Sequence, residues 1–268
     1  VVNSFVFNFD RPAKTLSRLF RYEYYGYPKE FLFSYQKTLA ALGGPAFLAM
    51  NNRTETGRLY SFYRERLDGL TRARIYTRYG MAPKPGELAV RERQSYGKDK
   101  EDYAVLFEET AGYQVSDRGA RLLAPEVWAR YEDSTLRNIF YILRQRREEP
   151  GLIVEHKETG VLENQPVEVV DITDAANRLV TVYLHRTTKL PLRQVFYRRD
   201  AMRYRHEEIS IFAKYRDVGG GAMWPWNIVR NRDGEKVFEI FSEQVTVNTE
   251  LEAKLFELPP DMPRLKAL

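Results

Sequence analysis

Residues 151–200 decide the fold, and they read GLIVEHKETGVLENQPVEVVDITDAANRLVTVYLHRTTKLPLRQVFYRRD. Four runs that contain apolar, β-branched or aromatic residues lie at 153–158, 167–173, 179–185 and 192–198, separated by short polar stretches. Such side chains suit the pleated, half-buried surface of a sheet. Because the connections are too short for a helix, the stretch predicts consecutive antiparallel strands rather than alternating strands and helices.

The same pattern continues on both sides of this stretch. Further strands are expected at 207–215, 223–229 and 237–247 on one side, and at 53–63, 73–77, 88–95, 103–108 and 113–122 on the other, the last with a turn at 117–119. The Asp-Gly pairs at 68–69 and 233–234 predict hairpin turns, and Gly219-Gly220-Gly221 predicts a bulge or a hairpin turn. We therefore expect a meander of about eleven strands.

Several of these strands are apolar on both faces. Val180, Val182 and Leu184 alternate with Leu179 and Tyr183. An ordinary exposed antiparallel sheet shows a cleaner alternation of apolar and polar residues. A wide sheet of this type must curl, and a curled sheet covered by one amphipathic helix encloses an apolar pocket.

Two helices are expected. A short one at 34–42 ends at Gly43-Gly44, and a long one runs from Pro125 to about Arg147, where Pro150-Gly151 stops it. Apolar residues recur along the long helix at a spacing of three and four. The predicted fold class is mainly β with α (α+β), with a strongly curved sheet and one amphipathic helix over it.

Composition excludes several classes of protein. The chain of 268 residues has a net charge of +5, but its basic and acidic residues are interleaved, as in Arg64-Glu65-Arg66. A nucleic-acid-binding protein usually concentrates its basic residues, so we expect either a mixed solvated surface or a weak, transient attraction to anionic membrane surfaces. The absence of cysteine excludes a thiol nucleophile, a disulfide framework and a cysteine-based metal site.

The residues that carry chemistry in enzymes form no recognisable set. His156, His185 and His206 stand singly, and the sequence contains neither a Gly-x-Ser-x-Gly elbow nor a phosphate-binding loop. The adjacent pairs of glutamates lie in predicted strands, where neighbouring side chains point to opposite faces. We therefore predict no catalytic residue, no metal site, no cofactor and no enzymatic activity.

The start of the chain differs from the rest. Residues 1–33 carry many aromatic residues broken by charges, with no continuous apolar segment and no small-residue cleavage site, so no signal peptide is identified. The expected organisation is an irregular extension at 1–33, a single domain at 34–260 and a C-terminal tail at 261–268.

Three stretches together resemble the LolA/LolB-like superfamily of bacterial envelope proteins, in particular its outer-membrane lipoprotein-sorting type. The resemblance covers about residues 35–260. It rests on the helix end at 40–44 followed by 54–57, on 165–171 with 180–184 and 188–193, and on 215–220 with Trp224-Pro225 and 255–259.

The resemblance implies an unclosed antiparallel β-barrel with a helical lid over an apolar cavity, located in the periplasm. Carriers of this fold shield the acyl chains of lipids or lipoproteins, whereas other relatives are stress sensors, and one is an enzyme acting on a small molecule. The sequence given has no lipobox cysteine, so it offers no evidence for a lipid anchor.

The leading hypothesis is a periplasmic carrier whose partner is a lipid or an acylated lipoprotein. The alternatives are an envelope sensor that uses the same pocket to report to a protein partner, and an enzyme on this fold. The helix from Pro125 to about Arg147 either packs permanently on the sheet or opens as a lid. Trp224 and Trp226 either anchor the core or form part of the cavity wall. The candidate ligand-facing residues are Trp128, Tyr131, Leu136, Ile139, Phe140, Leu143, Phe196, Trp224 and Trp226.

Overall fold

A computed structural model describes residues 29–81, 84–97 and 101–266. Most of the stretch at 1–33 therefore lies outside the described residues. Helix α2 (Lys29–Ala41) begins earlier than the expected start at residue 34, and α3 (Pro45–Leu48) follows it directly. No helix among the described residues has the length and apolarity needed to cross a bilayer.

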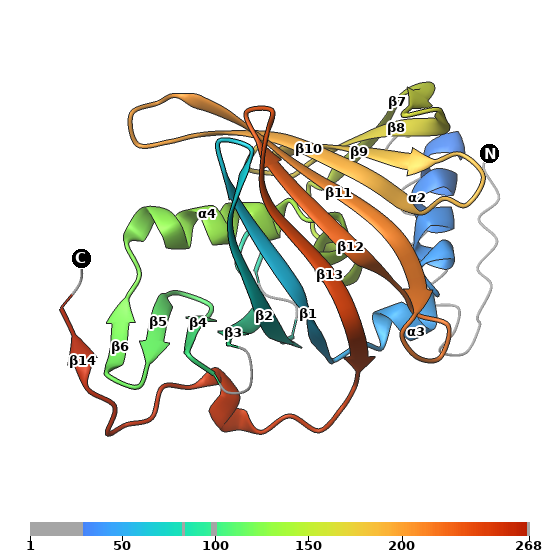
Figure 1. Ribbon diagram of the computed structural model, residues 1–268. Helices are drawn as coiled ribbons and strands as arrows, with labels where there is room; N and C mark the ends of the chain where they lie inside the picture. The colour runs from blue at the N-terminus through green and yellow to red at the C-terminus, as the bar shows by residue number, and fades with distance from the viewer. Residues whose placement is uncertain (1–28, 82–83, 98–100, 267–268) are drawn as a thin grey trace, which may run out of the picture.

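The described part of the chain forms one sheet of fourteen strands (Figure 1). In chain order the strands are β1 (Asn52–Tyr63), β2 (Arg66–Tyr79), β3 (Val90–Tyr96), β4 (Tyr103–Phe107), β5 (Gly112–Ser116), β6 (Gly119–Leu122), β7 (Ile153–Leu162), β8 (Gln165–Thr173), β9 (Leu179–His185), β10 (Pro191–Arg199), β11 (Arg205–Asp217), β12 (Met223–Arg232), β13 (Glu235–Val247) and β14 (Arg264–Leu265). Their spatial order is β14-β6-β5-β4-β3-β2-β1-β13-β12-β11-β10-β9-β8-β7. Every neighbouring pair is antiparallel except β14 with β6, and β14 and β7 are the two edges, so the sheet is unclosed.

The predicted class, a curved and unclosed antiparallel sheet with few helices, is confirmed, but the number of strands is higher than expected. The turn expected at 117–119 lies within the stretch 113–122, which therefore forms two strands, β5 and β6. In addition, β14 comes from the stretch at 261–268 that the sequence presents as a tail. Two-residue β14 pairs with Ala120 and Arg121 of β6, and no sequence pattern marks so short a strand.

The first hairpin turn lies elsewhere than predicted. Arg64 and Glu65 both have positive φ angles, of 48° and 60°, and they connect β1 to β2 as a two-residue turn. The Asp-Gly pair at 68–69 is part of β2 instead. Gly69 lies opposite Ser61, and a Cβ atom on Gly69 would come within 2.7 Å of the Ser61 hydroxyl oxygen. The glycine here therefore allows close packing across the strands and does not make a turn.

The expected long helix is divided into three parts. Helix α4 (Pro125–Leu136) is followed by α5 (Ile139–Tyr141) and by a π-helical turn, η1 (Ile142–Arg146). The break lies at Asn138, whose backbone is extended and whose side chain accepts hydrogen bonds from the backbone N–H groups of Phe140 and Tyr141. An asparagine side chain that caps a new helix stabilises such a break.

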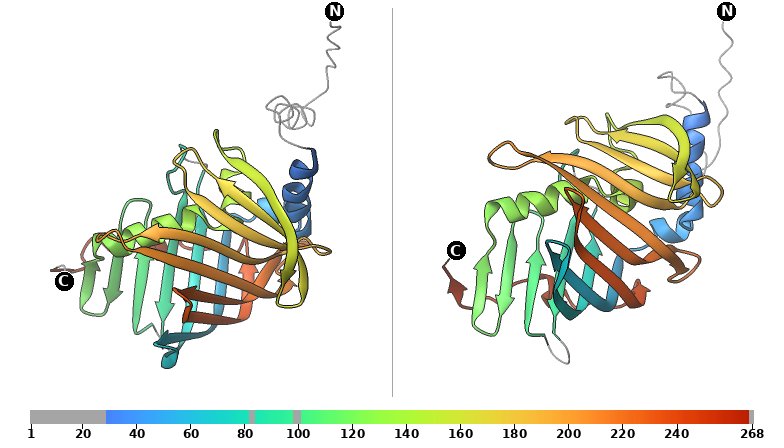
Figure 2. Two further views of the ribbon diagram at one scale, coloured as in Figure 1. Left: turned by 90° about the horizontal axis from the view of Figure 1, so that it is seen from above. Right: turned by 45° about the horizontal axis from the view of Figure 1, so that its top comes forward.

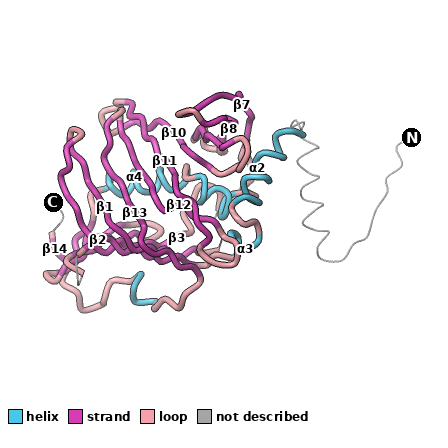
Figure 3. The backbone as a smooth tube through the Cα atoms, turned by 45° about the vertical axis from the view of Figure 1, so that its right-hand side comes forward, coloured by secondary structure: helices cyan, strands magenta, loops and turns pink. Residues whose placement is uncertain are grey.

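The sheet curls around the helices. Figures 2 and 3 show α4 inside the curve of the sheet and α2 beside β7 and β8 at one end. The main apolar core lies between α2, α3, α5 and η1 on one side and the inner faces of β8–β12 on the other, with Leu42, Phe47 and Leu143 among its buried residues. This core fixes α5 and η1 to the sheet.

The chain returns after β13 to cover the outer face of β4–β6. A 3-10 turn, η2 (Ala253–Phe256), comes first, and Leu258 and Met262 then pack against Leu106, Val115 and the small side chains beside them. The C-terminal segment thereby gives this end of the sheet a small core of its own. Figure 1 shows this segment running from β13 past β4 and β5 to β14.

Candidate functional site

A cavity of about 120 Å³ lies between the helical segment α4–α5 and the inner face of the sheet. Strands β1, β2, β3, β11 and β12 supply its floor. The lining residues are Arg53, Thr77, Tyr79, Val90, Glu92, Gln94, Tyr131, Ser134, Thr135, Asn138, Phe140, Tyr141, Ser210, Phe212, Trp224, Ile228 and Arg230.

One side of the cavity is polar because three neighbouring strands place polar side chains at the same level. Arg53 pairs with Thr77 across β1 and β2, and Thr77 pairs with Glu92 across β2 and β3. Arg53 Nη2 donates a hydrogen bond of 3.1 Å to Thr77 Oγ1, which donates one of 3.2 Å to Glu92 Oε2. The result is a continuous hydrogen-bonded row across the floor.

Arg53 is the most buried charge in this row, with 7% of its surface exposed. Burial alone would lower the pKa of its guanidinium group, but the nearby oxygens of Tyr79, Glu55 and Glu92 outweigh that effect and raise the pKa. The guanidinium also lies 3.9 Å from the ring centre of Trp224, a cation–π contact. Arg53 is therefore a fixed positive group beneath the cavity.

The other side of the cavity is aromatic and aliphatic. The ring of Phe140 lies 4.9 Å from that of Phe212 and 4.8 Å from that of Trp224, and Ile228 completes this wall. We expected an apolar cavity, and the structure shows a mixed one. The difference arises because Arg53, Thr77 and Glu92 of β1–β3 line the cavity together with the apolar Phe212, Trp224 and Ile228 of β11 and β12.

Helix α4 covers the cavity through an aromatic contact. The ring of Tyr131 stacks on that of Phe107 in β4 with 3.7 Å between centres, and Trp128 lies beside both. The opposite side of the helix faces solvent, with Val127 and Ala129 exposed. A helix of 12 residues is short, so its position depends on these tertiary contacts.

The segment α5–η1 is held by polar bonds as well as by the core. Arg144 Nε donates to the backbone oxygen of Met50 at 2.6 Å, and Gln145 Nε2 donates to the backbone oxygens of Gly80 and Ala89, each at 3.0 Å. These bonds tie η1 to the ends of β1–β3. The segment expected as one long helix therefore consists of a peripheral part, α4, and an anchored part, α5–η1.

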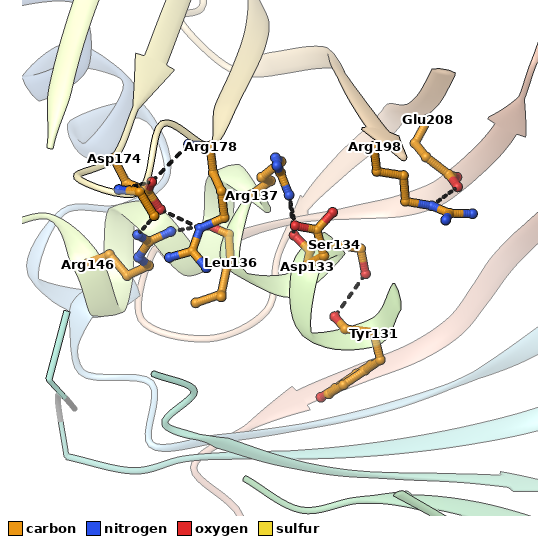
Figure 4. A network of polar contacts seen from close by, with 11 residues as sticks. Tyr131, Asp133, Ser134, Leu136, Arg137, Arg146, Asp174, Arg178, Arg198 and Glu208 are labelled. Atoms are coloured by element: carbon orange, nitrogen blue, oxygen red, sulfur yellow. Dashed lines mark hydrogen bonds and ion pairs between the residues drawn. The ribbon is translucent and has the colours of Figure 1, made fainter. Parts of the chain in front are cut away.

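A buried ionic cluster completes the anchor (Figure 4). Arg146 Nη2 and Arg178 Nε both lie 2.7 Å from Asp174 Oδ2, and Arg146 also pairs with Glu149 at 2.6 Å. Burial would raise the pKa of Asp174, but hydrogen bonds from Arg146 and Arg178 lower that pKa to about 2. The carboxylate is thus ionised at neutral pH and joins η1 to the β8–β9 connection.

Three solved structures share this architecture at low sequence identity. A domain from Vibrio parahaemolyticus described as an outer membrane lipoprotein-sorting protein matches with a TM-score of 0.54 at 15% identity, over 85% of this chain and 96% of that one. The chain has a LolA-like fold. A LolA superfamily protein from Nitrosomonas europaea matches with a TM-score of 0.52 at 10% identity, over 82% of this chain and 97% of that one. A DUF1329 family protein from Desulfovibrio piger matches with a TM-score of 0.56 at 9% identity, over 85% of this chain and 97% of that one.

These similarities establish the fold and confirm the resemblance found in the sequence. No protein-family model and no curated protein sequence matches the chain. Within the LolA-like fold, the described residues contain no group of three or more His, Cys, Asp or Glu side chains suited to a metal ion.

The LolA-like fold brings only some of the predicted ligand-facing residues to the cavity. Tyr131, Phe140 and Trp224 line it. Trp224 is also buried, so it is both a core residue and part of the wall, whereas Trp226 lies under Arg216, whose guanidinium is 4.3 Å from the ring centre. That these residues bind a ligand stays a prediction.

The remaining candidates belong to the core around the cavity. Leu136 packs with Leu88 and Val90, while Ile139 and Leu143 belong to the main core. Phe196 is buried under the guanidinium of Arg137, 5.2 Å away, and Trp128 lies beside Phe107.

The sequence analysis missed the polar floor. A signal for it exists in β1, where Arg53, Glu55 and Leu59 stand at alternate positions and share the buried face. Two charged residues in the apolar register of a strand indicate an internal polar site.

Proposed function

We propose that this protein is a non-enzymatic carrier of the bacterial envelope that holds the apolar chain of a lipid or an acylated lipoprotein between α4 and the curved sheet. The observation that carries the proposal is the cavity under α4, bounded by Phe140, Phe212 and Trp224. The LolA-like fold supports it, because one protein of similar structure is described as a lipoprotein-sorting domain.

The size of the cavity sets a requirement on the mechanism. At about 120 Å³ it is smaller than the roughly 300–1,000 Å³ of ordinary ligand pockets. A long acyl chain enters only if α4 moves away from the sheet. Such a movement separates Tyr131 and Trp128 from Phe107 and adds their aromatic surface to the binding site.

The free energy for opening α4 comes from the ligand. Moving an acyl chain out of water is worth about 0.8 kcal/mol for each CH₂ group. A chain of a dozen such groups therefore offsets the loss of the aromatic contacts between α4 and β4, which are worth about 0.5–1.5 kcal/mol per pair beyond the buried area. The hinge we propose is the break between α4 and α5, at Arg137 and Asn138.

The periplasm is the compartment we propose, since the named structures of similar fold include an outer membrane lipoprotein-sorting domain. The partner in this proposal is a lipid or the acylated end of a lipoprotein. Weak contact with the membrane surface follows from the need to collect such a ligand.

Native mass spectrometry tests the carrier proposal. Protein secreted to a bacterial periplasm and purified gently is expected to carry a near-stoichiometric phospholipid or acylated peptide, which solvent extraction then identifies. A ligand-free mass, unchanged after incubation with phospholipids and an acylated peptide, would contradict the proposal. A stable protein partner recovered without any lipid would favour the envelope sensor instead.

A further inference from the structure

Two arginine side chains share one carboxylate beside the cavity, and a third arginine belongs to α4. Arg198 Nε on β10 donates to Glu208 Oε1 on β11 at 2.8 Å, and Arg232 Nε on β12 donates to the same oxygen at 2.9 Å. Figure 4 shows Arg198 and Glu208 on the sheet near α4. Arg130 on α4 is the third arginine, close enough for its charge to interact with Arg232, Arg198 and Glu208.

This cluster lies on the inner face of the sheet. Ser210 and Arg230 pair across β11 and β12, and both line the cavity. Glu208 and Arg232 form the next pair on the same face, because successive side chains of a strand alternate between faces. The arginine cluster, defined as Arg130, Arg198 and Arg232, therefore continues the cavity towards the hairpin ends of β10–β12.

The positive charge of the arginine cluster is not balanced. Among the described residues, Glu208 is the single carboxylate bound by the two sheet arginines, and both use the same oxygen. Arg130 Nε is buried and has no hydrogen-bond partner within the same part of the chain. Burial first, and then repulsion from Arg232 and Arg198, lowers the pKa of Arg130 below its usual value.

The other carboxylates nearby are engaged or exposed. His206 Nδ1 lies 2.8 Å from Asp233 Oδ2, and His206 Nε2 lies 3.1 Å from Asp200 Oδ2. Glu126 is exposed in the first turn of α4. Arg198 and Arg232 share one carboxylate oxygen and the buried Nε of Arg130 is free to donate, so the cluster is suited to bind a further anion.

We propose that Arg130, Arg198 and Arg232 bind the anionic end of an amphiphile, a carboxylate or phosphate group, while its apolar chain lies under α4. The proposal rests on the proposed function and specifies its ligand class. Guanidinium groups match carboxylates and phosphates with two parallel hydrogen bonds. Since Arg130 belongs to α4 and the other two arginines belong to the sheet, the anion would also hold α4 against the sheet once the chain is inside.

The test is displacement of a fluorescent apolar probe by four compounds: dodecanoate, its methyl ester, dodecyl phosphate and inorganic phosphate. The wild-type chain is expected to bind dodecanoate and dodecyl phosphate more tightly than the uncharged ester. Arg130→Gln is expected to weaken both anions about tenfold or more and to leave the ester unchanged, as for the loss of a charge-assisted hydrogen bond. Arg58→Gln is the matched control, since it removes one exposed positive charge from the outer face of β1.

Each outcome bears on one proposal. The arginine cluster would be overturned as an anion site if the wild-type chain bound dodecanoate and its methyl ester with equal affinity, or if Arg130→Gln lost the same affinity for both. Either result would leave the proposed carrier function standing. Failure of every amphiphile to displace the probe would overturn the carrier itself. If inorganic phosphate displaced the probe at the same concentration as dodecyl phosphate, the site would be one for free phosphate, and the proposal that its ligand is an amphiphile would be overturned. Thermal unfolding of Arg130→Gln confirms that the variant is folded.

Discussion

Asp174 shows how one residue links the helical segment to the sheet. Its carboxylate holds Arg146 of η1 and Arg178 at the start of β9, and the pKa of about 2 lies below the ordinary 3.8. A depressed pKa means that the contribution to stability is complete above about pH 4 and is lost as the pH falls towards 2. The anchor of the cavity is therefore sensitive to acid and insensitive to pH near neutrality.

Replacing Asp174 with Asn should destabilise the protein by about 3 kcal/mol, because it leaves Arg146 and Arg178 buried with fewer partners. Urea unfolding at pH 7 measures the change. The control is Asp171→Asn, which breaks a pair with Lys157, a side chain that is 55% exposed, and should cost no more than about 1 kcal/mol. Equal losses in the two variants would show that the buried cluster has no special role.

Single residues also show the limits of the sequence analysis. Trp224 could be placed on the inner face from alternation alone, and both readings of it, core and cavity wall, hold together. Arg53 could be assigned to the buried face of β1 from its register with Leu59, but its position in a cavity could not be predicted from β1 alone. Its environment is created by Thr77, Glu92 and Trp224, which come from three other strands.

At the scale of elements, the apolar stripe of residues 125–147 correctly predicts helical structure but not its division. The stripe continues through Leu136, Ile139 and Leu143 because all three are buried. The break at Asn138 is set by a side-chain cap and by the π-helical turn after it, neither of which has a periodic signal. The division matters, since it separates a helix held by aromatic contacts from one held by the core.

Movement of α4 can be measured directly because the chain contains no cysteine. Spin labels at Ala129→Cys on α4 and Arg58→Cys on β1 should move apart by several ångströms when dodecanoate is added, since the acyl chain does not fit into about 120 Å³. Double electron–electron resonance gives this distance. The control pair joins Arg58→Cys to Ala176→Cys, next to the Asp174 anchor, and should not change. Binding without any change in the α4 distance would place the acyl chain elsewhere.

At the scale of the whole molecule, the meander could be predicted from residues 151–247 and their short turns. That the sheet stays open could not be predicted in the same way, because a local sequence pattern does not show whether the two edge strands of a sheet pair with each other. That expectation came from the resemblance to known envelope proteins. The cover over β4–β6 was missed as well, since Leu258 and Met262 are isolated apolar residues in a proline-rich segment.

Removing residues 249–268 should destabilise the protein by several kcal/mol, because it exposes the fully buried Phe256, worth about 1.5–3 kcal/mol, and the partly buried Leu258 and Met262 leave the sheet as well. Thermal unfolding and size-exclusion chromatography measure the loss and any association through the bared outer face. A chain ending at Leu265 keeps β14 and should behave as the intact protein. Normal stability of the shorter chain would show that the small core at β4–β6 is dispensable.

The two edge strands of the open sheet, β14 and β7, differ in length and in charge. The C-terminal β14 lies along β6, whereas among the described residues β7 pairs with β8 alone. Glu155, His156, Lys157 and Glu158 occupy the middle of this edge strand, and charged side chains discourage a second copy from adding its own strand there. If α4 opens to admit an apolar chain, as we propose, the protein is most prone to aggregate while its aromatic surfaces are separated. The charges of β7 would then oppose fibril-like self-association at this edge.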